Sequence, residues 1–370
     1  MSLTNFANLT SEQLTMWQRD IWKAARNNMF MNNFTGDSNT SMIQRISELK
    51  KDHKGARAVL TLVADLEGDG IAGDRTLEGN EEALKSYDQV IQIDQIRHAN
   101  RHEGRMADQK SVVTFRDNSK DVLSYWLSDR LDQLAFLTLS GVSYANQTNG
   151  AARVGSDLPF LEYAADVTAP TANRHRRWDV TTGLEAGNTA AVDALDVPSW
   201  AMLVEMKAYA KDQFLRPIRG EEGLELYHVF MTPQGFAQLK QDSDFLQAWR
   251  HAMPRSKDNP IFKGQTTGIM VDGLMLHEYR HVYNTKGLTS GVDKWGGSND
   301  VEGQRIIFAG AQAMGFADIG DPYWVEKGFD YENQQAISVG KMCGLKKPVF
   351  RSAINGTDED FGVMVLDTAI

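Results

Sequence analysis

Cysteine is almost absent from this sequence of 370 residues, in which Cys343 is the only one. A single cysteine excludes an intrachain disulfide and favours a reducing compartment. The N-terminal segment lacks the basic and apolar pattern of a secretory signal, and no run of about eighteen apolar residues could span a bilayer. We therefore expect a protein that folds inside a cell, with no membrane partner and with a buried, structural thiol.

Positively charged residues are also fewer than negatively charged ones. The chain has 39 lysines and arginines against 49 aspartates and glutamates, which gives a net charge of −10. This balance argues against a protein whose main task is to hold nucleic acid over a broad face. The one basic cluster of note is Asn173–Trp178, which we interpret as a solvated face that could contact phosphate. The hydrophobic content of 42% is ordinary and predicts a normal core, in one large domain or in two to three lobes.

Catalytic patterns are missing as well, with one apparent exception. The sequence has no phosphate loop, no dinucleotide-binding glycine pattern and no nucleophile elbow. The exception is His277-Glu278-Tyr279-Arg280-His281, a literal H-E-x-x-H that suggests a zinc metalloprotease as an alternative function. The protease motif must lie on a helix, whereas glycine, β-branched and aromatic neighbours predict a strand here, with the two histidines about 13 Å apart. We expect no metal, no cofactor and no catalytic residue.

The sequence is rich in strand-forming residues around one long polar stretch. Residues 56–63 and 87–96 predict two strands, and the acidic segment 65–82 between them has no apolar cluster that could bury it. A long connection of this kind is usually functional. The tip resembles a calcium loop only in part, because Thr76 occupies the position of the bidentate glutamate. We expect an extended β-hairpin that contacts another subunit through these residues: Glu67, Asp69, Asp74, Arg75, Glu78, Glu81, Glu82 and Lys85.

The segments on either side of the hairpin predict an arm and a long helix. The N-terminal arm has helical candidates at 11–25 and 40–52, with too little apolar surface to fold alone, so we expect it to lie on its own body or on a neighbour. Leucines spaced by four, four and three residues predict a long helix within 105–141. We expect four charged residues on the polar side of this helix: Asp121, Asp129, Arg130 and Asp132.

The second half of the chain alternates between helix and strand patterns. Residues 142–195 are irregular and predict loops with short strands. A helix begins near Asp196, with an apolar face that extends to Phe214. The alternation that follows predicts an α/β lobe with a sheet between helices. The last apolar strand is expected at 361–366.

Two patches of sequence carry a resemblance to a known family. The stronger patch consists of Gly68–Gly73, Leu77–Glu82 and Val90–His98. The second consists of Asn259–Gly264 with Asp272–Leu274, followed by the His277-Glu278 pair. In these patches, and in the order of its elements, the chain resembles the major capsid proteins of tailed bacteriophages of the N4-gp56 type, which have the HK97-like fold.

This resemblance implies an α+β fold with defined parts. They are an N-terminal arm (1–55), an extended loop (56–101), a peripheral domain with a long spine helix (102–190), an α/β axial domain (191–318) and a return to the peripheral domain (319–370). The resemblance also implies a structural protein of the virion and not an enzyme. Such a protein assembles in the bacterial cytoplasm into hexamers and pentamers of an icosahedral head that encloses double-stranded DNA.

The partners that the resemblance implies are other copies of the chain, scaffolding, portal and decoration proteins, and the packaged DNA through non-specific contact. The scaffold is expected to be a separate protein, since no long region precedes the arm. Besides the protease, one further alternative stays open, which is a virion module that binds a host or a carbohydrate without forming a shell. Sizing of the purified protein would separate this module from a shell protein.

Overall fold

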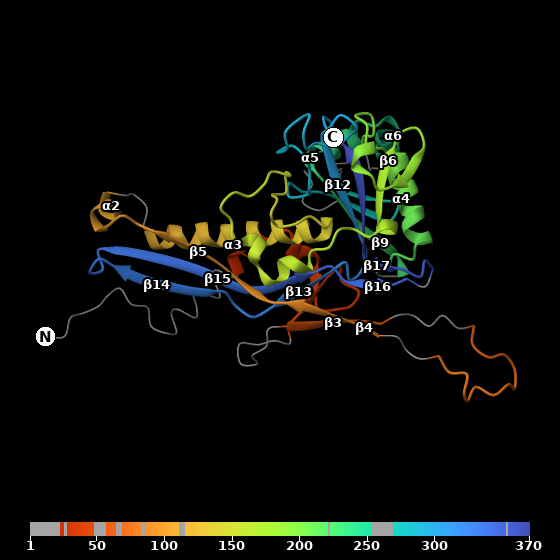
Figure 1. Cartoon of the computed structure of the whole chain (residues 1–370), viewed down its shortest axis with the longest axis horizontal. Coiled ribbons are helices and arrows are strands. Elements are labelled where there is room, and N and C mark those ends of the chain that lie inside the picture. The colour runs from red at the N-terminus through yellow and green to blue at the C-terminus, as the bar shows by residue number, and fades with distance from the viewer. Residues whose placement is uncertain are drawn as a thin grey trace.

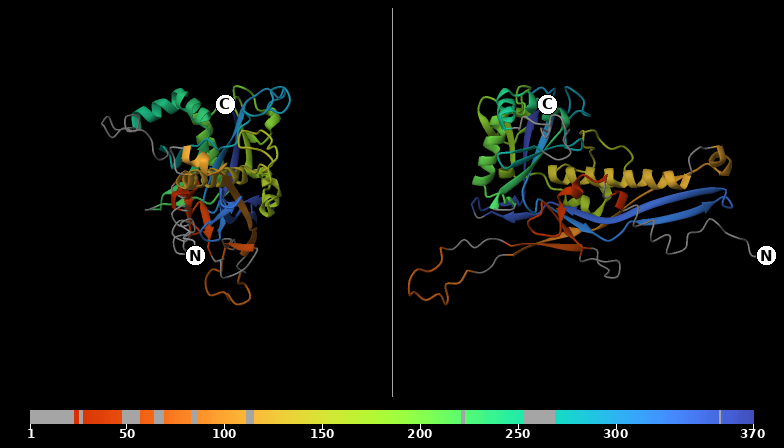
Figure 2. Two further views of the ribbon diagram at one scale, coloured as in Figure 1. Left: turned by 90° about the vertical axis from the view of Figure 1, so that its left-hand side faces the viewer. Right: turned by 180° about the vertical axis from the view of Figure 1, so that it is seen from behind.

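Two β-sheets and one long helix organise the chain (Figure 1). The computed structural model describes residues 23–25, 28–47, 57–63, 69–82, 86–110, 115–220, 223–252, 269–352 and 354–370. We call the six-stranded sheet, together with the helix α3 that runs along it, the long layer. We call the eight-stranded sheet and the three helices beside it the block. The block stands at one end of the long layer, and both are visible from the two sides in Figure 2.

The long layer has strands from distant parts of the chain. Its order is β1-β2-β13-β15-β14, and β5 pairs with the other edge of β15. The bounds are β1 Thr35–Gly36, β2 Ile43–Ile46, β5 Asp94–Arg101, β13 Met314–Asp318, β14 Tyr323–Phe329 and β15 Gln334–Lys346. The 13-residue strand β15 therefore contacts β13, β14 and β5 in turn.

The helix α3 (Phe115–Ser140) follows a short helix α2 (Arg105–Lys110) and confirms the predicted spine. The predicted leucine stripe is buried from Leu123 to Leu134, as the spacing required. Gly141, at φ +65°, ends the helix in the left-handed conformation that glycine adopts without strain. The prediction for Asp132 was wrong, since this carboxylate is 1% exposed and faces the core.

The block has the strand order β10-β11-β9-β12-β18-β6-β7, with β8 added to β9. The bounds are β6 His175–Asp179, β7 Gly183–Ala186, β8 Ile218–Arg219, β9 Glu225–Met231, β10 Ile269–Val271, β11 Leu274–Glu278, β12 Gly303–Ala309 and β18 Val363–Ala369. The helices are α4 Trp200–Asp212, α5 Pro233–Gln241 and α6 Ser243–Ala252. The α/β alternation predicted for this half of the chain is confirmed.

Remaining elements are short. Five 3₁₀ turns are described, namely η1 Met31–Phe34, η2 Leu158–Phe160, η3 Glu162–Asp166, η4 Ala172–Arg174 and η5 Thr189–Ala191. Two hairpins complete the structure, one from β3 Arg57–Val63 and β4 Ser86–Gln92, the other from β16 Val349–Arg351 and β17 Asp358–Asp360. Within the described part of the chain, no helix is long and apolar enough to cross a membrane.

The sheet of the block is buried on both faces at its centre, where every residue of β12 and β18 is buried and most are apolar. Val229 and Ile306 face the helices α4, α5 and α6, whereas their neighbours Phe230 and Ile307 face α3. Alternate residues of a strand point to opposite faces, so such continuous apolar runs require cover on both sides. This packing places the block directly on the C-terminal half of α3.

Local sequence signals set the helix starts in the block. The side chain of Ser199 accepts a hydrogen bond from the amide of Met202, and Thr232 does the same for Gly235. Pro233 occupies the first turn of α5, where its missing N–H is not needed. The predicted starts of α4 and α5 are thus confirmed to within a few residues.

Several sequence predictions fail in the structure. Residues 43–46 form a strand, not a helix, because β2 pairs in parallel with β13. The predicted strand 87–96 breaks at Ile93 into β4 and β5, which pair with different partners. Phe214 does not extend the apolar face of α4, since the helix ends at Asp212 and the ring is 76% exposed.

Some predictions concern residues outside the described part, and others are not decided. Of the helical candidate at 11–25, only residues 23–25 are described, and they are helical. The patch Asn259–Gly264 lies outside the described residues. The structure places β18, from the predicted return segment 319–370, in the sheet of the block, and β13, from the predicted axial segment 191–318, in the long layer. The domain limits themselves stay predictions.

Candidate assembly surface

The hairpin β3–β4 leads to a loop that projects from the body (Figures 1 and 2). One face of the hairpin is apolar, and Leu60, Leu62 and Ile91 pack against Ala317 of the long layer. The other face is open, and Val59 is 48% exposed. The alternation of β-branched and polar residues therefore fixes which side of the hairpin lies on the body, and the loop continues beyond it.

Two glycines allow the hairpin to lie against the long layer. A Cβ atom at Gly344 would lie 2.1 Å from the carbonyl oxygen of Gln92, and one at Gly315 would lie 2.7 Å from Cδ1 of Ile91. Lys346 Nζ donates to the carbonyl of Val90 at 2.8 Å. The hairpin at the base of the loop is thus held against the long layer by close contacts at the two glycines and by the hydrogen bond from Lys346.

The described tip, residues 69–82, is exposed along almost its whole length. It contains six of the eight predicted contact residues, and all six are exposed: Asp69, Asp74, Arg75, Glu78, Glu81 and Glu82. The other two, Glu67 and Lys85, lie outside the described residues. The carboxylate of Glu81 accepts from the amide of Gly79 at 2.7 Å, and Asn80 donates to the carbonyl of Thr76 at 3.2 Å. Turns of this kind shape the tip locally.

The N-terminal arm is fastened to the body by Asp132 of α3. Its carboxylate accepts from the amides of Phe30 and Met31 at 2.8 and 3.1 Å, and from the hydroxyl of Tyr279 at 2.6 Å. Burial raises the pKa of Asp132. The helical period alone could not reveal this role, because a single aspartate on a helix is normally solvated.

Two histidines and four aromatic rings form a cluster where the arm meets the block. The rings of His228 and His277 lie with Nδ1 and Nε2 2.9 Å apart, and the ring of Phe34 packs edge-on against both. Desolvation lowers the pKa of His228 to about 4 and that of His277 to about 3. At neutral pH, both rings are therefore uncharged parts of an aromatic core that also contains Phe30, Phe230 and Tyr279.

The H-E-x-x-H sequence does not form a metal site. Its strand prediction is confirmed for His277 and Glu278, which end β11, but was wrong for His281, which lies in the following turn. His281 contacts Asp129 at 2.8 Å, whereas His277 contacts His228. Among the described residues, no group of three potential ligands could hold a metal ion. The two histidines belong to different clusters.

The predicted solvated basic cluster 173–178 is folded inward, so that prediction was wrong. Arg174 is fully buried and lies 3.3 Å from the carboxylate of Glu359. Arg177 pairs with Asp179 at 3.1 Å and also with Glu185. These arginines hold β6, β7 and β17 together. They are therefore not available to phosphate. The sequence around residues 173–178 could not show this, because the carboxylate that pairs with Arg174 lies at Glu359.

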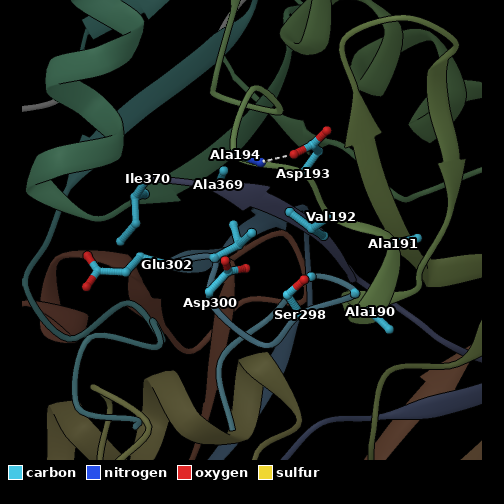
Figure 3. A pocket seen from close by; sticks show the side chains of 13 residues that line it. Ala190, Ala191, Val192, Asp193, Ala194, Ser298, Asp300, Glu302, Ala369 and Ile370 are labelled. Carbon is cyan, nitrogen blue, oxygen red and sulfur yellow. Dashed lines mark hydrogen bonds between the residues drawn. The ribbon is translucent and has the colours of Figure 1, made fainter. Parts of the chain in front are cut away.

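A pocket of about 690 Å³ opens at the outer end of the block (Figure 3). It is lined by two loops and by the chain end at Ile370, with mostly small residues and the carboxylates of Asp193, Asp300 and Glu302. The carboxylate of Asp193 accepts from the amide of Ala194 at 2.7 Å, and Glu302 pairs with Lys294 at 2.7 Å. Its lining holds no histidine, cysteine or basic residue.

Comparison with known proteins identifies the molecule that carries these features. The sequence matches the family described as "Phage capsid protein" over residues 5–370. The chain belongs to this family. It is 56% identical over 364 residues to the major capsid protein of Pseudomonas phage KPP25. This alignment covers 98% of this chain and 96% of that protein. As a phage capsid protein it is a structural component of the shell, and nothing supports the protease alternative.

Solved capsid structures confirm the predicted fold. The capsid of Ralstonia phage GP4 matches with a TM-score of 0.73 and 27% identity, over 92% of this chain and 90% of that one. The capsid of the cyanophage Pam1 matches with a TM-score of 0.70 and 18% identity, over 100% and 96%. The phage capsid protein described here therefore has the α+β, HK97-like fold that the sequence resemblance implied.

Proposed function

We propose that this chain assembles in the bacterial cytoplasm into hexamers and pentamers of an icosahedral phage head around double-stranded DNA. We propose further that the acidic tip of the projecting loop lies on a neighbouring copy. The observation that carries the second proposal is the exposure of residues 69–82 on a loop that reaches beyond the body (Figure 1). The membership of the chain in the phage capsid protein family supports the first.

The loop has the physical properties of an intermolecular contact. An ordered polar loop of this length inside a monomer normally packs by its own side chains or on its own domain. The tip is instead held at its base by Lys346 and by the glycines of the long layer, and it exposes charge at its end. Charged groups at the edge of an interface set register and association rate more than affinity.

Other partners follow from the same assignment. We propose a separate scaffolding protein, a portal and decoration proteins as partners, with non-specific contact to the packaged DNA. We assign no catalytic residue, cofactor or membrane contact to the chain. We also keep the domain limits 1–55, 56–101, 102–190, 191–318 and 319–370 as part of this proposal.

Replacement of residues 65–82 by a short Gly-Ser turn tests the role of the tip. The turn joins β3 and β4 without touching their packing, so the variant should fold with an unchanged circular dichroism spectrum and fail to form shells. Electron microscopy and sedimentation would measure particle yield. A matched control keeps the loop length and replaces only the uncharged Asn80 by serine, and it should assemble. Shells at normal yield from the shortened variant would contradict an essential tip.

The sizing of the unaltered protein tests the shell assignment itself. A capsid protein predicts rings or particles in the megadalton range, because many modest interfaces repeat by symmetry. A virion module that binds a host without forming a shell predicts one small species under all assembly conditions. Light scattering coupled to size exclusion distinguishes the two.

A further inference from the structure

Three arginines meet on the open side of α3, beside the block. Arg130 lies on α3, Arg153 on the loop that follows it, and Arg280 on the turn after β11. Nη1 of Arg130 and Nη2 of Arg153 both donate to Oε1 of Gln133, at 2.8 and 3.0 Å. Arg280 pairs with the carboxylate of Asp129, and Nη2 of Arg130 lies 3.8 Å from it. We call Arg130, Arg153 and Arg280 the arginine cluster.

The arginine cluster has too few negative partners. Burial alone would raise the pKa of Asp129, but the hydrogen bond to His281 and the nearby arginines lower it, so this carboxylate is ionised at neutral pH. Burial lowers the pKa of His281, so its ring adds no charge at neutral pH. Among the described residues, no carboxylate other than Asp129 pairs with the three arginines. Three cations against one anion leave two positive charges uncompensated.

The fold holds these guanidinium groups close together although they repel each other. Burial lowers the pKa of Arg153, and the charge of Arg130 lowers it further. Nε of Arg130 is buried without a hydrogen-bond partner, whereas the side chain of Arg280 is 71% exposed. An anion that enters such a cluster relieves the repulsion and receives several fork-shaped donors at once. The arginine cluster is therefore suited to bind an anion from the solvent side.

The arginine cluster and the acidic tip belong to different sides of the long layer. Phe316 of β13 packs in the core that contains α3. Its neighbour Ala317 packs with Leu60 and Ile91 of the hairpin β3–β4. Successive residues of a strand point to opposite faces, so α3 and the hairpin cover opposite faces of the sheet (Figure 1). The loop beyond the hairpin carries five carboxylates and one arginine within residues 69–82. The hairpin side would therefore repel a polyanion, and the side of α3 would attract one.

We propose that the arginine cluster is a phosphate site through which the subunit contacts the backbone of the packaged DNA. The inference rests on the proposed function, since it names the surface of the chain that faces the DNA. A phosphodiester group carries its negative charge on two exposed oxygens and can accept from two guanidinium groups at once. Two uncompensated charges neutralise about two phosphates, which gives a weak contact that depends on salt. A weak contact agrees with the net charge of −10, which opposes tight binding over a broad face.

An acidic segment of another copy is the competing occupant. The described tip would have to reach from the hairpin side of its own sheet to the α3 side of the next copy. Subunits of a closed, symmetric shell present the same face inwards, so the tip and the arginine cluster would face opposite ways. This occupant predicts a different outcome in the experiment below.

Chemical footprinting of Arg280 tests the contact on the unaltered protein. Phenylglyoxal reacts with exposed guanidinium groups, and mass spectrometry of the digested protein gives a rate for each arginine. The rates should be measured for unassembled chains, for shells without DNA and for DNA-filled particles. Arg280 should react at least about threefold more slowly in the filled particles than in the other two states, because a phosphate contact blocks the guanidinium. Arg219, exposed on β8 of the block, is the control and should react alike in empty and filled shells.

The three states separate the outcomes. Equal rates for Arg280 in empty and filled shells overturn the proposal. Protection that is already complete in the empty shells would assign the arginine cluster to a neighbouring subunit and also overturn it. Failure of the unaltered chain to form particles would refute the proposed function itself, and with it this inference.

A substitution that keeps every arginine gives a second test. Gln133→Glu places a carboxylate at the oxygen that Arg130 and Arg153 share, so the chain itself supplies the anion and repels phosphate. Filled particles of this variant should lose the protection of Arg280. The matched control Gln234→Glu makes the same charge change at an exposed position of α5 and should keep the protection. Protection that persists with Gln133→Glu overturns the proposal, and if this variant does not fold, the footprint of the unaltered protein decides.

Discussion

The carboxylate of Asp132 and the hydroxyl of Tyr279 lie 2.6 Å apart, and this bond joins the long layer to the block. The same carboxylate accepts from the amides of Phe30 and Met31, about a hundred residues earlier in the chain. Arm, spine helix and block therefore meet at one buried acid. A buried acceptor with several donors is costly to remove, because every donor then loses its partner.

Removal of this acid should loosen the arm and destabilise the fold. We expect Asp132→Ala to lower the free energy of unfolding by about 3 kcal/mol, since it leaves a buried amide, a part-buried amide and a part-buried hydroxyl without an acceptor. Urea denaturation measures this value, and limited proteolysis reports release of the arm. Asp121→Ala, at an exposed position of the same helix, should change stability by no more than about 0.5 kcal/mol. Equal effects of the two substitutions would show that the hydrogen bonds of Asp132 do not stabilise the fold.

The paired histidines predict a dependence of stability on pH. The folded pKa values of His228 and His277, about 4 and about 3, lie below the ordinary value of 6.5. The unfolded chain therefore binds more protons in this range, so their contribution to stability is full above pH 6.5 and is lost as the pH falls towards 4. Over these roughly 2.5 pH units the unfolded chain binds about two more protons than the folded chain, so at about 1.4 kcal/mol per proton and pH unit the pair loses up to about 7 kcal/mol.

Thermal melts of the parent and of a His228→Gln, His277→Gln variant would isolate this contribution, because carboxylates that also titrate in acid are common to both. The difference in stability between the two proteins should shrink as the pH is lowered from 7 to 4. A constant difference across this range would show that the histidines do not carry the effect.

A buried ion pair holds the centre of the block. Arg305 donates to both oxygens of Asp367, at 2.8 and 3.1 Å, and His175 lies 2.6 Å from the same carboxylate. Burial alone would raise the pKa of Asp367, but Arg305 and His175 together lower it. We expect Asp367→Ala to cost about 4 kcal/mol of unfolding free energy, because it leaves Arg305 charged, buried and unpaired.

The exposed pair Lys211–Glu225 supplies the matched control. Its atoms lie 2.7 Å apart, as close as those of the buried pair, but both side chains are nearly half exposed. Glu225→Ala should therefore cost less than about 1 kcal/mol. Chemical denaturation of both variants measures the contrast, and similar losses would show that burial does not decide the value of the pair.

The thiol of Cys343 should be inert in the folded protein. The side chain is fully buried, and burial raises its pKa to about 11. A thiol reagent at pH 8 should therefore label the native protein at a negligible rate and the urea-unfolded protein at once. Ser338→Cys, at a half-buried position of β15, should react in the native state. Rapid labelling of the parent protein would show that the long layer opens around Cys343.

The sequence predicted elements well where one period dominates. The leucine spacing located the spine helix, and the polar stretch between two β-branched arms located the projecting loop. The fold family followed from a local resemblance and was confirmed by comparison. Prediction failed for 43–46, where parallel pairing with β13 imposes a strand, because no local pattern reveals a partner 270 residues away.

Charged residues were the other source of error. Asp132 and Arg174 both read as solvated from their neighbours in sequence, and both are buried with partners more than a hundred residues distant. A local pattern indicates how often such a charged residue is exposed. Only the folded structure shows whether an opposite charge or a set of amides contacts it.

The strand β15 bears on how the molecule resists stretching. It runs beside β14 and β13 on one edge and beside β5 on the other, so its ladders lie parallel to the long axis (Figure 1). A pull along that axis would load these hydrogen bonds in shear, many at once, and not one after another as in peeling. The long layer is therefore suited to carry tension between the two ends of each subunit.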